Sequence, residues 1–172
     1  LFMGEYKFKT KPYDHQLKAL EKSWDKEYYG LFMEMGTGKS KVLIDEIASL
    51  YMRGKISAAL IVAPKGVYRN WEKGELPAHM PDEIPLHVAA WKAPSEMTIQ
   101  DKKDLKEILI ANGRLRILLM NVEAFSGVKG SKFAAQFLHK SNTLMAIDES
   151  TTIKTPSAAR TKNILKIGKL AK

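Results

Sequence analysis

The stretch FMEMGTGKSKVLIDEIA, residues 32–48, combines a glycine turn with the apolar spacing of a following helix. Glycines let the backbone curl so that consecutive N–H groups point at one centre, where a helix also presents the positive end of its dipole. Lys39 would reach the β and γ phosphates of a nucleotide, and the Ser40 hydroxyl would ligate Mg²⁺. The residues expected to bind the phosphates of ATP are Met35, Gly36, Thr37, Gly38, Lys39 and Ser40.

The full phosphate-loop signature fails at its first position, where Met33 stands in place of glycine. An ordinary glycine turn before a helix is therefore the alternative interpretation. The order of strand, turn, Lys-Ser and amphipathic helix favours a nucleotide site.

Apolar runs of strand length recur along the chain, at residues 31–35, 58–63, 117–120 and 143–147. Continuous apolar runs are typical of strands buried on both faces, and the helix-like stretches between them indicate a parallel sheet. We expect an α/β domain with a mostly parallel central sheet and helices on both faces.

Helical patterns separate these runs, and their ends are marked by glycine, proline or polar residues. One expected helix begins at Asp14 and ends near Gly30. Others are expected at residues 67–76, 99–111 and 131–139. Four prolines make the segment 77–94 unsuitable for a helix, but residues 86–90 have the pattern of an extra short strand.

Two adjacent carboxylates, Asp148 and Glu149, end the apolar run in LMAIDEST, residues 144–151. Parallel sheets bind ligands at the carboxyl ends of their strands, so this pair is expected to face the phosphate loop. Asp148 would hold Mg²⁺ and Glu149 would orient and deprotonate the attacking water. The alternative is a polar strand exit that caps the next helix.

The composition limits the class of protein. The 172 residues are 45% hydrophobic, which suits one compact domain, and cysteine is absent, which excludes a disulfide scaffold. No apolar run has membrane-spanning length, so a soluble intracellular protein, cytoplasmic or nuclear, is expected. The formal net charge of +9 fits either a polyanion partner or a solvated lysine-rich surface.

Four blocks in order resemble the first motor domain of superfamily 2 helicases and translocases, most closely the Swi/Snf branch. They are KPYDHQLKAL at 11–20, EMGTGKS at 34–40, LIVAPKGVYRNWEKGEL at 60–76 and IDESTTIKTPSAARTK at 147–162. The branch also lacks a small residue where Met33 stands. The resemblance implies a RecA-like P-loop NTPase fold, a nucleic-acid partner favouring duplex DNA, and adenine recognition by Gln16.

Nucleic-acid contacts are likewise implied by the resemblance. The residues it assigns to them are Lys65, Arg69, Asn121 and Lys154. Trp71 is a base-stacking candidate, but its helical spacing from Val67 favours a place in the core.

The chain reaches Lys172 before the point where the family would show a second motor domain with an arginine finger. We therefore expect residues 1–172 to form a single N-terminal motor domain that needs its second lobe in cis. In related enzymes the arginine increases the rate of hydrolysis about 10³- to 10⁵-fold, so slow turnover of this chain alone is expected. The alternatives are a stand-alone ATP-dependent clamp or adaptor, or, less favoured for lack of an arginine cluster, a P-loop kinase.

Overall fold

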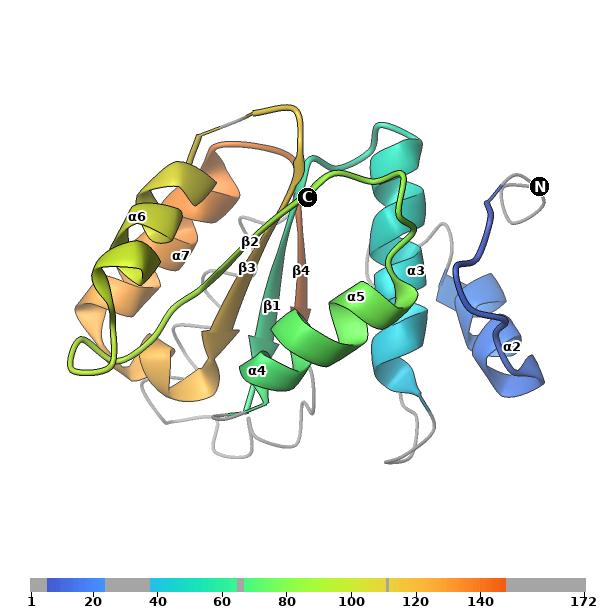
Figure 1. Cartoon of the computed structure of the whole chain (residues 1–172), viewed down its shortest axis with the longest axis horizontal. Coiled ribbons are helices and arrows are strands. Elements are labelled where there is room, and N and C mark those ends of the chain that lie inside the picture. The colour runs from blue at the N-terminus through green and yellow to red at the C-terminus, as the bar shows by residue number, and fades with distance from the viewer. Residues whose placement is uncertain (1–5, 24–37, 65–66, 111, 148–172) are drawn as a thin grey trace.

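The computed structural model describes residues 6–23, 38–64, 67–110 and 112–147 of the chain (Figure 1). Helices and strands alternate along these residues. In chain order the elements are α2 Asp14–Ser23, α3 Lys39–Met52, β1 Ala58–Ala63, α4 Tyr68–Asn70, the π-helical turn η1 Trp71–Glu75, α5 Leu76–His79, β2 Leu86–Ala90, α6 Ile99–Ile108, β3 Leu115–Asn121, the 3₁₀ turn η2 Val122–Ser126, α7 Val128–His139 and β4 Thr143–Ile147.

The described strands form one sheet in the order β2-β3-β1-β4, with every neighbouring pair parallel. Strand β1, AALIVA, lies inside the sheet, and all six of its residues are buried. An uninterrupted apolar run is what such a position requires, because both faces of the strand are covered.

Helices cover both faces of this sheet (Figure 1). Ala59 and Ile61 of β1 face a core shared with α3 and with Trp71 and Leu76 of the helical segment after β1. Alternate residues, such as Leu60, face a second core that contains buried side chains of α6 and α7. The predicted α/β fold, with a parallel sheet between two helical layers, is confirmed.

Most element positions agree with the sequence prediction. The strands at 58–63, 86–90 and 143–147 have the expected bounds, and β3 extends beyond the expected 117–120 to Leu115–Asn121. Trp71 is buried at 1% exposure, which confirms its place in the core. The expected strand at 31–35 and the end of the first helix near Gly30 lie outside the described residues.

The helix expected to end at residue 76 instead continues to His79, so the prediction that Pro77 excludes helix was wrong. A wide π-helical turn covers Trp71–Glu75, and a new α-helical turn begins at Leu76. Proline is tolerated in the first turn of a helix because its missing N–H has no partner there.

Two other helix boundaries differ from the prediction. Helix α6 ends at Ile108 rather than at residue 111, and α7 begins at Val128 rather than at residue 131. Gly127 precedes α7 in an extended conformation, and its carbonyl accepts from the Ser131 N–H. The first turn of α7 therefore begins before Ser131, the polar residue at which the sequence predicted the start of the helix. Among the described helices, none is both long and apolar enough to cross a membrane.

Candidate nucleotide-binding cleft

The amino end of α3 lies at the edge of the sheet where the strands have their carboxyl ends (Figure 1). Gly38 precedes the helix with φ 75° and ψ 38°, a left-handed conformation that glycine adopts without strain. The first turn of α3 contains no acidic residue, and its N-cap residue, Gly38, has no side chain with which to cap it. Its amide donors and its dipole therefore favour an anion at this position.

A cleft of about 1010 Å³ opens at this end of α3. Its floor is formed by residues 38–41, which include Lys39 and Ser40. One wall is the segment 10–14 with Gln16, and the other carries Asn70, Glu75 and His79. The volume lies at the upper end of the range usual for small-molecule sites, about 300–1,000 Å³.

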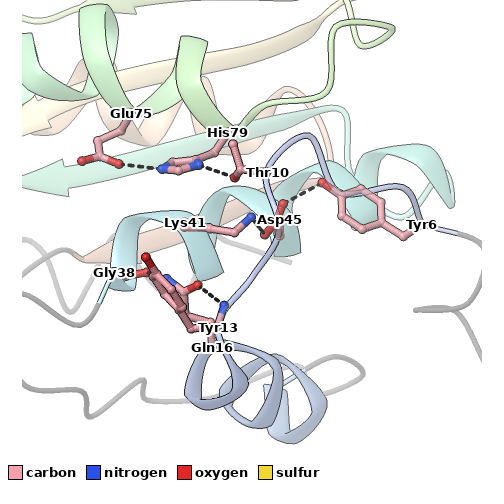
Figure 2. A network of polar contacts seen from close by, with 9 residues as sticks. All are labelled: Tyr6, Thr10, Tyr13, Gln16, Gly38, Lys41, Asp45, Glu75 and His79. Atoms are coloured by element: carbon pink, nitrogen blue, oxygen red, sulfur yellow. Dashed lines mark hydrogen bonds and ion pairs between the residues drawn. The ribbon is translucent and has the colours of Figure 1, made fainter.

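Gln16 joins the wall of the cleft to its floor (Figure 2). Its side chain is buried; Oε1 accepts from the Tyr13 N–H at 2.8 Å, and Nε2 donates to the Gly38 carbonyl at 3.3 Å. The first bond is half of a capping box, since Gln16 is the third residue of α2 and Tyr13 precedes the helix. An amide nitrogen carries two hydrogens, so the bond to Gly38 leaves one for a ligand.

A buried polar triad fastens the amino-terminal segment to α3 (Figure 2). Asp45 accepts hydrogen bonds from the Tyr6 hydroxyl at 2.9 Å and from Lys41 Nζ at 2.8 Å. The side chains of Lys41 and Asp45 are only 5% and 2% exposed. Burial raises the pKa of Asp45 above its ordinary value, outweighing the opposite effect of Lys41, and burial beside Asp45 also raises the pKa of Tyr6.

A second polar chain holds the same segment to α5. The Thr10 hydroxyl lies 2.7 Å from His79 Nδ1, and His79 Nε2 lies 3.4 Å from a Glu75 carboxylate oxygen (Figure 2). Lys9 also donates to the Pro77 carbonyl at 2.7 Å. Residues 6–13 therefore bridge α3 and the helical segment 68–79, and this bridge forms one wall of the cleft.

Neither polar network was predicted from the sequence. Lys41 and Asp45 are four residues apart on a helix whose other buried residues are mostly apolar, and that spacing was the available signal. Tyr6 is 39 residues away from Asp45 along the chain, and nothing in its neighbourhood marks the contact.

The structure brings Gln16, Gly38, Lys39 and Ser40 together around the cleft. Arg69 is exposed in α4, after the carboxyl end of β1. Asn121 ends β3, and its side chain caps η2 by accepting from the Ala124 N–H at 2.8 Å. The other predicted site residues lie outside the described part of the chain: Met35, Gly36, Thr37, Lys65, Asp148, Glu149 and Lys154.

Strand β4 ends at Ile147, one residue before the predicted acidic pair. It pairs in parallel with β1, so its carboxyl end belongs to the edge that carries the amino end of α3 (Figure 1). Ile147, the last described residue, therefore lies at the sheet edge that carries the amino end of α3.

Comparison with known proteins identifies the fold. No protein-family model and no curated protein matches the sequence. Among solved structures, the chain is similar to the Sulfolobus solfataricus SWI2/SNF2 ATPase core in complex with dsDNA, with 17% identity and a TM-score of 0.54. The match covers 94% of this chain and 36% of that one. At this identity the likeness concerns architecture, and the chain has the RecA-like α/β fold of such an ATPase core.

Proposed function

We propose that the chain is the ATP-binding motor domain of a nucleic-acid-dependent ATPase, either a helicase or a translocase on duplex DNA. The observation that carries the proposal is the cleft at the amino end of α3. There, a helix terminus with glycine as its N-cap and without acidic residues in its first turn lies beside Lys39, Ser40 and Gln16. These groups provide the positive potential and the hydrogen-bond donors that a nucleoside triphosphate requires.

Each cleft residue has a role in this proposal. Lys39 contacts the β and γ phosphates, Gln16 donates its second Nε2 hydrogen to adenine, and residues 35–38 supply backbone N–H groups. Ser40 and Asp148 hold Mg²⁺, which neutralises charge on the phosphates when bound. Glu149 accepts the proton of the attacking water, since it follows the strand that ends at the same edge.

Nucleic acid is the proposed partner on three grounds. The chain has a formal net charge of +9, and Arg69 is exposed after the carboxyl end of β1. The similar ATPase core was solved with double-stranded DNA. We infer that Arg69, with Lys65 and Lys154, contacts phosphates of duplex DNA, and that a second motor lobe completes the ATP site.

The test measures ATP hydrolysis with and without duplex DNA, using this chain alone and extended at its carboxyl end by the proposed second lobe. We expect DNA to stimulate turnover of the extended protein, and Lys39→Ala and Glu149→Gln to abolish it. Lys55→Ala is the matched control, because Lys55 is exposed beyond the opposite end of α3. Binding of ATP and DNA without turnover would identify a clamp or adaptor and refute the motor.

A further inference from the structure

His87, Asp104 and Glu107 converge on the side of the sheet opposite α3. Each side chain offers one ligand atom, and these atoms all lie within 4.8 Å of one another. His87 belongs to β2, at the edge of the described sheet, and both carboxylates belong to α6. We propose that this trio binds a divalent transition-metal ion, with Zn²⁺ as the best fit.

The packing of α6 on β2 fixes this convergence. Residues three apart on a helix share a face, so Asp104 and Glu107 project together. The neighbours Leu105 and Ile108 are buried in the same core as Ala89 of β2. Because His87 is two residues from Ala89 on the strand, it points to the same face of the sheet. The trio therefore rests on the hydrophobic core beneath it.

Neighbouring groups restrain two of the three side chains. The His87 Nδ1 atom lies 3.2 Å from the side-chain amide of Asn112, and Asp104 accepts from Gln100 Nε2 at 2.8 Å. The bond from Gln100 orients the Asp104 carboxylate before a metal arrives, as is common for metal ligands. The Asn112 nitrogen can only donate, so His87 Nδ1 accepts in this contact, and binding of a metal by Nε2 requires the ring proton to move to Nδ1 and the Asn112 side chain to turn. Asp104 and the ring of His87 are also partly buried, which limits the rotamers open to them.

The local charge favours a cation. Two carboxylates at this separation repel each other, and a divalent ion between them removes the repulsion. Lys103 is a neighbouring cation, 3.9 Å from Glu107, with 66% of its side chain exposed. An exposed ion pair of this length contributes little, so it competes weakly with a metal.

One imidazole and two carboxylates suit Zn²⁺ and its transition-metal neighbours, whereas Mg²⁺ prefers oxygen ligands and water. A tetrahedral ion with bonds of about 2.0–2.1 Å holds its ligands about 3.3 Å apart, so ligand atoms that lie up to 4.8 Å apart must close by up to about 1.5 Å. Glu107 can supply this movement because its side chain is 47% exposed. The fourth ligand would be water, and the ion would join the edge strand to α6.

The experiment is a calorimetric titration of the full chain with Zn²⁺, after treatment with a chelator and in the presence of excess Mg²⁺. We expect one saturable site, whose affinity falls at least about tenfold in His87→Gln and in Glu107→Gln. His139→Gln and Glu72→Gln remove the same groups from other exposed positions and should change nothing. Thermal unfolding in chelator shows whether each variant is folded.

A second readout is the melting temperature. With Zn²⁺ at a hundredfold excess over its dissociation constant, the melting temperature should rise by about 5 °C or more, and this rise should disappear in His87→Gln. Absence of saturable Zn²⁺ binding would overturn the proposal, as would binding that persists unchanged in folded His87→Gln and Glu107→Gln. Lys39→Ala should retain the Zn²⁺ site, so this result is independent of the proposed nucleotide function.

Discussion

Replacement of Gly38 by alanine tests the link between the turn before α3 and the wall of the cleft. Gly38 has φ 75°, and a Cβ atom added there would overlap Nε2 of Gln16. The substitution therefore has two separable costs. One is backbone strain at the alanine, and the other is displacement of the Gln16 side chain.

The structure sets the size of each cost. A left-handed conformation costs a residue with a Cβ about 1–2 kcal/mol. Gln16 can rotate away from the new methyl group, but it then loses its bonds to the Tyr13 N–H and the Gly38 carbonyl. At about 0.5–1.5 kcal/mol for each hydrogen bond, this displacement costs about 1–3 kcal/mol. Gly38→Ala should thus lower the free energy of unfolding by about 2–5 kcal/mol.

Gly54→Ala is the matched control. Gly54 follows α3 with φ 71°, and a Cβ there would meet nothing within 4 Å. It should carry only the strain of about 1–2 kcal/mol. The difference between the two alanine variants isolates the contact with Gln16.

The assay is urea unfolding, followed by tryptophan fluorescence, of Gly38→Ala, Gly54→Ala, Gln16→Ala and the double variant Gly38→Ala with Gln16→Ala. In the double variant the overlap is absent, so its loss of stability should be smaller than the sum of the two single losses by about 1–3 kcal/mol. Equal stabilities of Gly38→Ala and Gly54→Ala, or strict additivity in the double variant, would show that the alanine at residue 38 does not displace Gln16.

Three further contacts are tested by variants, each by urea unfolding. Asp45→Leu leaves Lys41 as a buried unpaired cation and should lower the free energy of unfolding by about 3–5 kcal/mol. Adding Lys41→Met should recover most of this loss, and a double variant as unstable as Asp45→Leu alone would contradict this. Hydrogen bonds from Lys92 and from Thr98 lower the pKa of Asp101 from 3.8 to about 2. The contribution of the ionised Asp101 to the free energy of unfolding is therefore complete above pH 3.8 and is lost as the pH falls through 2. Asp101→Asn should therefore show a deficit of about 1 kcal/mol at pH 7 that disappears near pH 2, and a deficit that is constant with pH would disprove the ionic role. Asn121→Ala should cost about 1 kcal/mol through loss of the η2 cap, whereas Asn121→Asp should retain the cap, and equal losses would argue against capping.

The parallel sheet was predictable because its buried strands are continuous apolar runs, which can be recognised in the sequence. A run such as Ala58–Ala63 is apolar at every position, and its length sets its bounds. Likewise, Lys39 and Ser40 follow a glycine turn at adjacent positions, so the sequence alone places them at one helix terminus. These features depend on residues that are neighbours in the chain.

Contacts between distant segments could not be predicted in this way. Tyr6 reaches Asp45 across 39 residues, and His87 meets two carboxylates of α6 only once that helix packs on β2. The helix at Pro77 was missed for a different reason, since proline is unfavourable inside a helix but suits the new turn that follows η1.

Equilibrium binding of ATP with Mg²⁺ to this chain is the most direct test of the nucleotide site. We expect saturable binding that Lys39→Ala weakens about 10- to 150-fold, the equivalent of losing one charge-assisted contact of about 1.5–3 kcal/mol. Lys55→Ala, at the opposite end of the same helix, should bind ATP as the unaltered chain does. Absence of saturable binding, or equal affinities in Lys39→Ala and Lys55→Ala, would contradict the assignment of the cleft as a nucleotide site.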